Sequence, residues 1–391
     1  MKIDKKNPTH WLQLIRFSLT TLLALFRRSL PNTKTAPPIP QILLYGHKFN
    51  GNLKALYLEL IKHPDEFRVF FLSMDSAYID QLQKQGIKAI DGCHPHNSKI
   101  LATASAIVSD HGLHCLELLL RFSDIKFIDV WHGIPFKGFD KKDFRIQHRY
   151  EEIWVSSKLI KSLYVDKFGF PEHKVVITGY GRTDKLVHNH QNIGSLKRSL
   201  KITDTDKPVI LFAPTWKQDL EGRNIYPFNM DETNFLELAQ SICDNCNAYF
   251  VIRHHLNTTK KSEDKSSIIY LPADQYTDTE DILLISDLLI CDWSSIAFDY
   301  LALSRPTLFL DVAPPFTKGF SLTPEFRYGQ IVTNRRELAR DSELTLSRPE
   351  EYWSAHMPTH RRTIEAVYDH TLDGKSASRY LDRIRSELQQ V

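Results

Sequence analysis

Short, nearly continuous apolar runs recur along this chain, and segments with helical character separate them. Because apolar residues fill these runs instead of alternating with polar ones, each run is typical of a strand covered on both faces. Strands that alternate with helices in this way predict βαβ units on a parallel sheet. The runs form two series, which cover residues 41–46, 68–73, 105–110, 126–133, 152–157 and 174–181, and then 207–216, 248–255, 267–272, 287–295 and 305–311.

A polar, charged stretch at residues 186–207 separates the two series and indicates a connection between domains. The 391 residues are enough for two domains, and the 42% hydrophobic content is enough to build a core in each. We therefore predict an α/β fold with two Rossmann-type, doubly wound domains that face a cleft. The predicted domains cover residues 35–195 and 196–391. The second includes a helical C-terminal region, from about residue 332, that could pack back on the first domain.

Residues 1–34 differ from the rest of the chain because they carry seven basic residues against one acidic residue. The uncharged stretch at 17–26 is too short for a spanning helix, which needs about 20 apolar residues, and no signal-peptide cleavage site follows it. We predict an amphipathic helix that binds an anionic membrane surface. A helix packed on the protein's own surface is the alternative. The expected membrane-facing residues are Trp11, Leu14, Ile15, Leu22, Leu23 and Phe26.

Composition and missing motifs exclude several functional classes. A net charge of +3 and the lack of an RNA-binding signature argue against a nucleic-acid partner. Five sparse cysteines do not indicate a disulfide framework, which fits a cytoplasmic protein. Cys243 and Cys246 form a lone CxxC motif, which does not predict a zinc site without a second pair. Because Walker A and GxGxxG motifs are missing, neither a P-loop NTPase nor a dinucleotide-binding enzyme is predicted.

Polar residues suited to catalysis follow the carboxyl ends of the apolar runs, where doubly wound sheets bind ligands. In WHGIPFKGFD (131–140), a strand end presents His132, and Gly133 permits a sharp turn. Histidine is suited to accepting a proton from a hydroxyl near neutral pH, and Lys137 adds positive charge. The alternative is a core histidine beside a structural tryptophan.

The sequence ILFAPTWKQD (210–219) ends the first run of the second series. The hydroxyl of Thr215 and the ammonium group of Lys217 suit a phosphate. A solvated turn is the alternative.

The sequence VIRHHLN (251–257) ends the next run. Arg253 and His255 share one side of the predicted strand, and His254 takes the other. His255 could hydrogen-bond a diphosphate or balance the charge of a leaving group. Because the two histidines face opposite sides, joint metal ligation is not expected, and no metal site is predicted.

The segment ISDLLICDWSSIAFDY (285–300) gives the strongest signal. A buried strand leads into Ser294 and Ser295, and an amphipathic helix follows. Serine is a favoured N-cap, and a helix N-terminus suits an anion, so we expect a diphosphate site here. Asp299 follows one helical turn later. Ordinary capping without a ligand is the alternative, and it is compatible with phosphate binding.

Together these segments resemble the CDP-glycerol glycerophosphotransferase family of teichoic-acid primases and polymerases. The resemblance covers about residues 40–335. Its motifs are WHG with a downstream lysine (131–137), FAPTWK (212–217), the RxH pattern of Arg253 and His255, SDLLICDWSSIAFDY (286–300) and KGFSLTPEFRYGQIV (318–332). This sequence departs from the family pattern at Trp293, where tyrosine is common, and at Leu256, where proline or tyrosine is common.

The resemblance implies a GT-B-like fold, with the CDP donor on the C-terminal domain and the acceptor over the N-terminal one. It implies that His132 is the base for the acceptor hydroxyl and that His255 contacts the donor phosphates or assists the departure of CMP. The implied donor-phosphate ligands are Thr215, Lys217, Arg253, Ser294 and Ser295. The resemblance also assigns Asp299 and Glu325 to the donor polyol or nucleotide, and Lys137 to the acceptor side.

The predicted function is transfer of a polyol phosphate, most simply glycerol phosphate, from a CDP-polyol to a hydroxyl of a lipid-linked saccharide or a teichoic- or capsule-type polymer. No cofactor is required in this prediction, although Mg²⁺ could accompany the donor diphosphate. The expected location is the inner face of the cell membrane, as a cytoplasmic peripheral protein. The alternatives are a GT-B glycosyltransferase that uses a nucleotide sugar and a non-catalytic, membrane-bound assembly scaffold.

Overall fold

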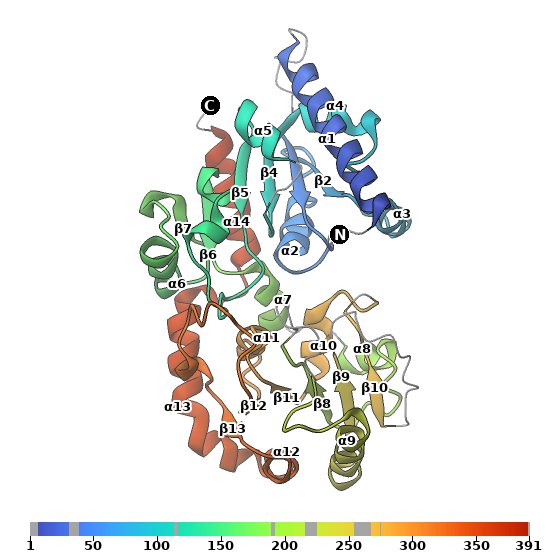
Figure 1. Cartoon of the computed structure of the whole chain (residues 1–391), viewed down its shortest axis with the longest axis vertical. Coiled ribbons are helices and arrows are strands. Elements are labelled where there is room, and N and C mark those ends of the chain that lie inside the picture. The colour runs from blue at the N-terminus through green and yellow to red at the C-terminus, as the bar shows by residue number, and fades with distance from the viewer. Residues whose placement is uncertain are drawn as a thin grey trace. The chain divides into compact units, whose positions relative to one another are not determined.

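The chain forms two compact units in the computed structural model (Figure 1). The first unit comprises Met1–His132, Asp140–Asp184 and Lys375–Val391, and the second comprises Gly133–Phe139 and Lys185–Gly374. The structure describes residues 7–30, 39–112, 116–188, 192–215, 225–253, 267–273 and 275–389. Each unit is built on its own parallel sheet, which confirms the predicted α/β fold with two doubly wound, Rossmann-type domains.

The sheet of the first unit has seven parallel strands in the order β3-β2-β1-β4-β5-β6-β7. The six predicted runs of the first series all form strands in it. The sequence did not reveal β3, because three residues are too few to stand out as a run. The strands are β1 (Gln41–Tyr45), β2 (Arg68–Ser73), β3 (Ala89–Asp91), β4 (Ala104–Ser109), β5 (Lys126–Asp129), β6 (Glu152–Val155) and β7 (Val175–Ile177).

The sheet of the second unit has six parallel strands in the order β10-β9-β8-β11-β12-β13. Five of them match the second predicted series, and β13 is again a short addition. In both sheets the strand order reverses beside the first strand, between β1 and β4 and between β8 and β11. The strands are β8 (Val209–Phe212), β9 (Tyr249–Ile252), β10 (Ile268–Tyr270), β11 (Leu288–Cys291), β12 (Thr307–Leu310) and β13 (Gln330–Val332).

Helices follow most of the strands, as the alternating pattern predicts. In the first unit, apolar side chains of α2 and α14 pack with those of β1 and β2 in one buried core. In the second, α9 and α12 pack against β8, β9 and β11. The described α-helices are α1 (Pro8–Ser29), α2 (Gly51–Leu60), α3 (Ser76–Lys84), α4 (Ser98–Ala102), α5 (Glu117–Phe122), α6 (Lys158–Ser162), α7 (Asp184–His188), α8 (Ile193–Ser199), α9 (Glu232–Cys246), α10 (Thr279–Ile285), α11 (Ile296–Leu301), α12 (Arg335–Ser347), α13 (Pro349–Val367) and α14 (Ser376–Gln389).

The division into units differs from the predicted boundaries at 35–195 and 196–391, most clearly at α14. This C-terminal helix returns to the first sheet, as Figure 1 shows in red beside β5 and β6. The ring of Tyr380 stacks on Trp154 with a centroid distance of 4.7 Å, and its hydroxyl accepts a hydrogen bond from Gly181 N at 2.9 Å. Arg383 also pairs with the buried carboxylate of Glu152. Arg385 of α14 pairs with Glu66 as well, so an apolar face and these ion pairs hold α14 on the first unit.

The segment Gly133–Phe139 is the second difference, because it belongs to the second unit. Gly138 N donates to Gly319 O at 2.7 Å, and Ser321 N donates to Phe136 O at 3.0 Å. A Cβ atom at Gly138 would lie 2.3 Å from Lys318 O, so only glycine permits this approach. The two predicted motifs 131–140 and 318–332 thus pair with each other backbone to backbone.

Helix α1 packs on the first unit through one face and exposes the other. Phe17, Thr20, Thr21 and Ala24 are buried, and the Phe17 ring lies so close to Gly92 that a Cβ atom there would be 2.3 Å from it. The predicted alternative of a helix on the protein's own surface is therefore correct for this face. In the described part of the chain, no helix is both long and apolar enough to cross a membrane. The large apolar residues of the opposite face that are exposed are Trp11, Leu12, Ile15, Leu19, Leu22, Leu23 and Phe26.

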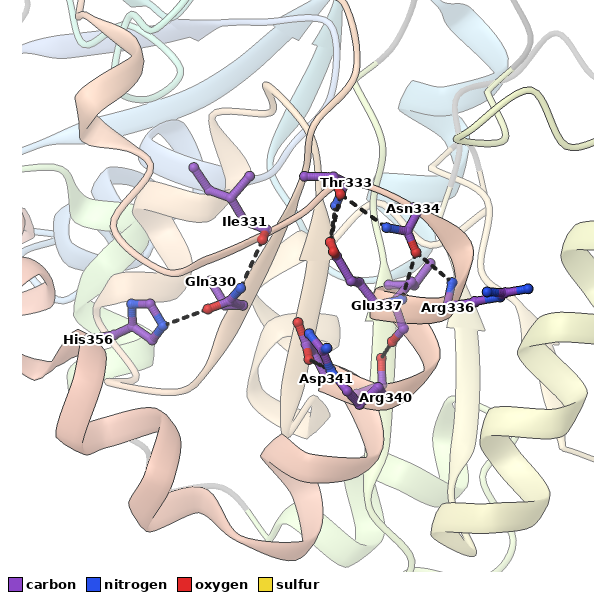
Figure 2. Close-up of polar contacts among 11 residues, drawn as sticks. Gln330, Ile331, Thr333, Asn334, Arg336, Glu337, Arg340, Asp341 and His356 are labelled. Atoms are coloured by element: carbon purple, nitrogen blue, oxygen red, sulfur yellow. Dashed lines mark hydrogen bonds and ion pairs between the residues drawn. The ribbon is translucent and has the colours of Figure 1, made fainter.

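Helix α12 begins with a complete set of capping contacts (Figure 2). The side chain of Asn334 accepts hydrogen bonds from Arg336 N and Glu337 N, both at 3.0 Å. In return, the carboxylate of Glu337 accepts from the backbone N of Thr333 at 2.7 Å and from its hydroxyl at 2.8 Å. These contacts satisfy backbone donors that a helix start otherwise leaves unpaired.

Candidate functional site

The backbone before His132 adopts an unusual conformation. Trp131 follows β5 with φ of 45°, a left-handed value that is rare for a bulky side chain. Asp129 accepts a hydrogen bond from Trp131 N at 2.7 Å, and the buried amide of Asn52 donates to the carbonyl oxygens of Val130 and Trp131, both at 2.9 Å. These contacts hold the left-handed backbone conformation that directly precedes His132.

His132 is oriented as a base. Its Nδ1 lies 3.0 Å from the carbonyl oxygen of Asp110. A carbonyl oxygen can only accept, so Nδ1 carries the proton and Nε2 of the neutral ring keeps a lone pair. The side chain is solvent-exposed, which rules out the alternative of a core histidine. The surrounding protein nevertheless desolvates the imidazolium and, with His111, lowers the pKa of His132 to about 4.

Two residues beside His132 were missed in the sequence. The carboxylate Oδ1 of Asp110 lies 2.6 Å from Nδ1 of His111, and the His111 ring stacks on His132 with a centroid distance of 4.6 Å and an interplanar angle of 5°. Desolvation lowers the pKa of His111, but the Asp110 carboxylate outweighs it, so this pKa lies above its usual value. Asp110 and His111 directly follow β4 at the carboxyl end, which is the signal that identified the other motifs.

In the second unit, Thr215 and Asp292 join two neighbouring strand ends. The backbone N of Thr215 donates to Oδ1 of Asp292 at 2.6 Å, and the Thr215 hydroxyl donates to the same oxygen. Asp292 is buried and directly follows β11, whereas Thr215 follows β8. The two predicted motifs therefore meet at the point where the strand order reverses, which is where doubly wound sheets bind ligands.

The paired serines lie at this point, but they do not cap the helix as expected. Ser294 is half-buried and Ser295 is exposed. Ser295 occupies the N-cap position of α11 without a side-chain capping hydrogen bond. Helix α11 has only six residues, so its dipole adds less positive potential than a long helix would. Asp299 lies in α11 and is buried.

Trp293 anchors an aromatic cluster next to the serines. Its Nε1 donates to Val312 O at 2.7 Å, and the Arg327 guanidinium carbon lies 4.0 Å from the ring centroid. The rings of Phe136 and Phe320 lie 5.9 Å and 4.9 Å from it. The departure from tyrosine at this position thus has a packing reason, because only the indole supplies this ring area together with an N–H donor.

The remaining predicted site residues differ in their surroundings. Lys137 belongs to the second unit, where it forms an isolated antiparallel bridge with Phe320, and Glu325 is exposed. Arg253 is buried and donates to Leu271 O, Tyr276 O and the hydroxyl of Thr279. These contacts show that Arg253 has a structural role. Its proposed contact with a donor phosphate stays a prediction. Lys217 and His255 lie outside the described residues.

The described residues contain no group of three or more histidine, cysteine or acidic side chains arranged to hold a metal ion. Cys243 and Cys246 lie in the last turn of α9. Burial raises the pKa of Cys246 to about 11, so its thiol stays protonated and is a poor metal ligand near neutral pH.

Comparison with known proteins identifies the family. Residues 33–386 match the family described as CDP-Glycerol:Poly(glycerophosphate) glycerophosphotransferase. The chain belongs to this family. The glycerophosphotransferase family is the one predicted from the motifs, and membership makes the chain a transferase.

Several curated relatives are teichoic-acid enzymes. The chain is 27% identical over 326 residues to the teichoic acid glycerol-phosphate transferase of Staphylococcus aureus, which covers 75% of this chain and 80% of that one. It is 32% identical over 227 residues to the ribitol-phosphate polymerase TarL of the same species, or 54% of this chain and 40% of TarL.

A solved structure shows the same fold. The wall teichoic acid polymerase TagF aligns with a TM-score of 0.76 at 20% identity, over 96% of this chain and 95% of that chain. At this identity the likeness concerns the fold alone, which is GT-B-like.

Proposed function

We propose that this protein transfers a polyol phosphate from a CDP-linked polyol to an acceptor hydroxyl and releases CMP. The observation that carries the proposal is the orientation of His132, whose Nδ1 is bound to a carbonyl so that Nε2 remains a proton acceptor. Family membership supplies the reaction class, a glycerophosphotransferase.

The proposed step is an in-line displacement at the β-phosphorus of the donor. The acceptor oxygen forms the new P–O bond, its proton passes to Nε2 of His132, and the bond to CMP breaks. In such reactions positioning and charge stabilisation do most of the work. Hydroxyls of Ser294 and Ser295 would bind the donor phosphates, because these residues lie at the strand-order reversal of the second sheet. Thr215 is proposed as a further ligand there, and its hydroxyl would exchange the carboxylate of Asp292 for a phosphate oxygen when the donor binds.

The other assignments complete this proposal. Lys217 and His255 follow β8 and β9 in the sequence, where positive charge would neutralise a leaving phosphate. Buried Asp299 and exposed Glu325 are proposed for the polyol and the nucleotide, and Lys137 for the acceptor. No resident cofactor is proposed, and Mg²⁺ would enter only with the donor diphosphate.

The donor polyol and the acceptor are tested together. The purified chain is incubated with CDP-glycerol, CDP-ribitol or a nucleotide sugar, each with a lipid-linked saccharide acceptor, and the products are read by mass spectrometry. We expect CMP release and a phosphodiester-linked product with CDP-glycerol. The relatives include both glycerol- and ribitol-phosphate enzymes, so CDP-ribitol is the informative competitor. A glycosidic product would establish the glycosyltransferase alternative, and no product with any donor would favour the scaffold.

We also propose that α1 binds the anionic inner face of the cell membrane, with the enzyme on the cytoplasmic side. The exposed apolar residues of α1 recur three or four positions apart along one face, and Phe26 is 63% exposed. Phe122 on α5, which packs against α1, is 71% exposed. Of the residues predicted to enter the membrane, only Leu14 is half-buried. Arg16 and Arg27 would meet anionic headgroups.

Vesicle sedimentation tests this surface. We expect the protein to pellet with vesicles that contain phosphatidylglycerol and to stay in solution with phosphatidylcholine alone. Leu19→Glu and Phe26→Glu should abolish pelleting, because each places a charge in the apolar face. Leu58→Glu is the matched control, because Leu58 is 43% exposed on α2. Equal pelleting of all variants would contradict the assignment to α1.

A further inference from the structure

We propose that Asp110 and His111 are positioning residues that together hold His132 in its neutral, base-competent form. The inference rests on the proposed function of His132 and extends it to residues outside the family motifs named above. One residue, Asp110, binds both rings: its side chain contacts His111, and its backbone contacts His132.

The backbone contact sets the tautomer of His132. The Asp110 carbonyl oxygen lies 3.0 Å from Nδ1 of His132, so that nitrogen is the donor and Nε2 faces away with its lone pair. A side-chain substitution at Asp110 keeps this carbonyl. The two contacts of Asp110 can therefore be separated by mutation.

The side-chain contact sets the charge of His111. The distance of 2.6 Å between Oδ1 of Asp110 and Nδ1 of His111 is that of a charge-assisted hydrogen bond. The Asp110 carboxylate is buried, so solvent screens this pair weakly. The pair thus favours an imidazolium at His111.

Because the two rings stack, a positive charge on His111 disfavours protonation of His132. The two rings are parallel within 5° and 4.6 Å apart, so a proton on one ring opposes a proton on the other. The proton stays on His111, which has the carboxylate. The other ionisable groups that face the pair are Asp129 at the end of β5, Arg182 before α7, and His47 after β1, whose ring lies 4.7 Å from that of His111.

Arg182 acts in the same direction as His111. Its guanidinium donates to the carbonyl oxygen of His132, and its positive charge also disfavours an imidazolium there. The carbonyl and the carboxylate of Asp110 act against this at His132 itself, because both favour an imidazolium there, but desolvation, His111 and Arg182 outweigh them and lower the pKa of His132. The carboxylate of Asp129 favours the proton on His111, although burial raises its own pKa to about 7. The site therefore retains an unprotonated base to a lower pH than a free histidine would.

Two variants test the inference. His111→Gln removes the charge but keeps a polar side chain of similar length. Asp110→Asn removes the carboxylate and keeps the backbone carbonyl that sets the tautomer. His96→Gln is the control, because His96 and His94 form another ring pair in the first unit, with centroids 6.4 Å apart and an interplanar angle of 78°.

The pKa of His132 is measured by the pH dependence of hydrogen–deuterium exchange at its imidazole carbon, followed by mass spectrometry of the full chain. We expect a rise of about 1 pKa unit in His111→Gln, from the Coulomb interaction of two charges at this separation. The rise in Asp110→Asn should be smaller, because this variant also removes the direct attraction of the carboxylate for an imidazolium at His132. The acid limb of kcat/KM should move by the same amount to higher pH, since activity requires neutral His132. At pH 8.5, kcat should be nearly unchanged, which a merely structural defect would not produce.

The outcomes separate the two proposals. A pKa of His132 that stays at the wild-type value in folded Asp110→Asn would overturn the inference, as would an equal shift in His96→Gln. If His111→Gln does not fold, Asp110→Asn decides. If the wild-type chain transfers no polyol phosphate, the proposed function fails, while the exchange measurement still tests the coupling of the two rings.

Discussion

The two sheets share one topology but present different chemistry at the same place. Around the reversal of strand order, β2-β1-β4-β5 corresponds to β9-β8-β11-β12. An aspartate directly follows the strand after the reversal in each sheet, Asp110 after β4 and Asp292 after β11. Asp110 binds the imidazole of its neighbour, and Asp292 binds the threonine loop that follows β8.

This difference shows how one fold serves two roles. In the first sheet the carboxylate supports a pair of imidazoles, which suits proton transfer. In the second the carboxylate accepts hydrogen bonds from the backbone N–H and the hydroxyl of Thr215, and so fixes the loop after β8 beside the paired serines. The equivalent aspartates are therefore a common framework, and the residues that they bind determine the chemistry.

The largest effect should come from the imidazole side. His132→Gln removes the proposed base, and kcat should fall about 10²–10⁴-fold. Steady-state CMP release measures this change, and thermal unfolding should be the same as in wild type. His173→Gln, at an exposed histidine of the first unit, is the control and should retain full activity. Wild-type turnover in the His132 variant would show that His132 is not the base, and the proposed difference between the two sheets would then be wrong.

The second unit also holds an imidazole with a low pKa, but it should act on stability. His360 is 2% exposed and contacts the Tyr352 hydroxyl at 2.8 Å. Burial and nearby His356 lower its pKa to about 4. Below about pH 6.5, His360 binds a proton in the unfolded chain but stays neutral in the folded chain. The free energy of unfolding should therefore fall by about 2–3 kcal/mol towards pH 4.

Urea unfolding at pH 7 and pH 4.5 checks this expectation. The loss of unfolding free energy between the two pH values should shrink in His360→Gln. An identical loss in the variant and the wild type would show that His360 does not carry it.

The aspartate of the second sheet can be tested next. Asp292→Ala leaves the backbone N–H and hydroxyl of Thr215 without their carboxylate acceptor, so the free energy of unfolding should fall by about 1–3 kcal/mol. Titration calorimetry should also show weaker binding of CDP. Thr215→Val removes only the hydroxyl contact and should have a smaller effect on stability. Unchanged CDP affinity in Asp292→Ala would show that this carboxylate does not support donor binding.

The smallest effect should distinguish a capping residue from a ligand-binding one. Asn334 caps α12 through two hydrogen bonds, so Asn334→Ala should lower stability by about 1 kcal/mol without changing CDP binding. Ser295 makes no such contact at α11, so Ser295→Ala should leave stability nearly unchanged and weaken CDP binding. Denaturant unfolding and calorimetry on both variants measure this reversal, and the opposite pattern would return Ser295 to ordinary capping.

The sequence revealed most of the fold because buried parallel strands are apolar on both faces. Strands β3 and β13 were missed because three residues carry too little pattern. The sequence suggested that the C-terminal region could pack back on the first domain, and α14 does so. Which part of that region returns could not be predicted, since an amphipathic pattern shows that a helix packs but not against which strands. The position of Gly133–Phe139 depends on contacts with residues more than 180 positions later, which no local signal reveals.

The candidate site was predictable where a motif stands alone and unpredictable where it depends on a neighbouring strand. His132 and the paired serines were found because each follows its own apolar run. Asp110 and His111 reach His132 only because β4 lies beside β5 in the sheet. Likewise, Asp292 can accept hydrogen bonds from Thr215 only because β11 lies beside β8. Sheet order is a long-range property, so these partnerships emerge from the structure.

The backbone pairing of Gly138 with Gly319 has a mechanical consequence for catalysis. The chain leaves the first unit immediately after His132 and returns at Asp140, so this short tether connects the base to the loop beside Trp293. Residues 318–321 are thus hydrogen-bonded to a segment whose first residue, Gly133, is joined by a peptide bond to His132. This segment is therefore a covalent link between the residue proposed as the base and the unit proposed to bind the donor nucleotide.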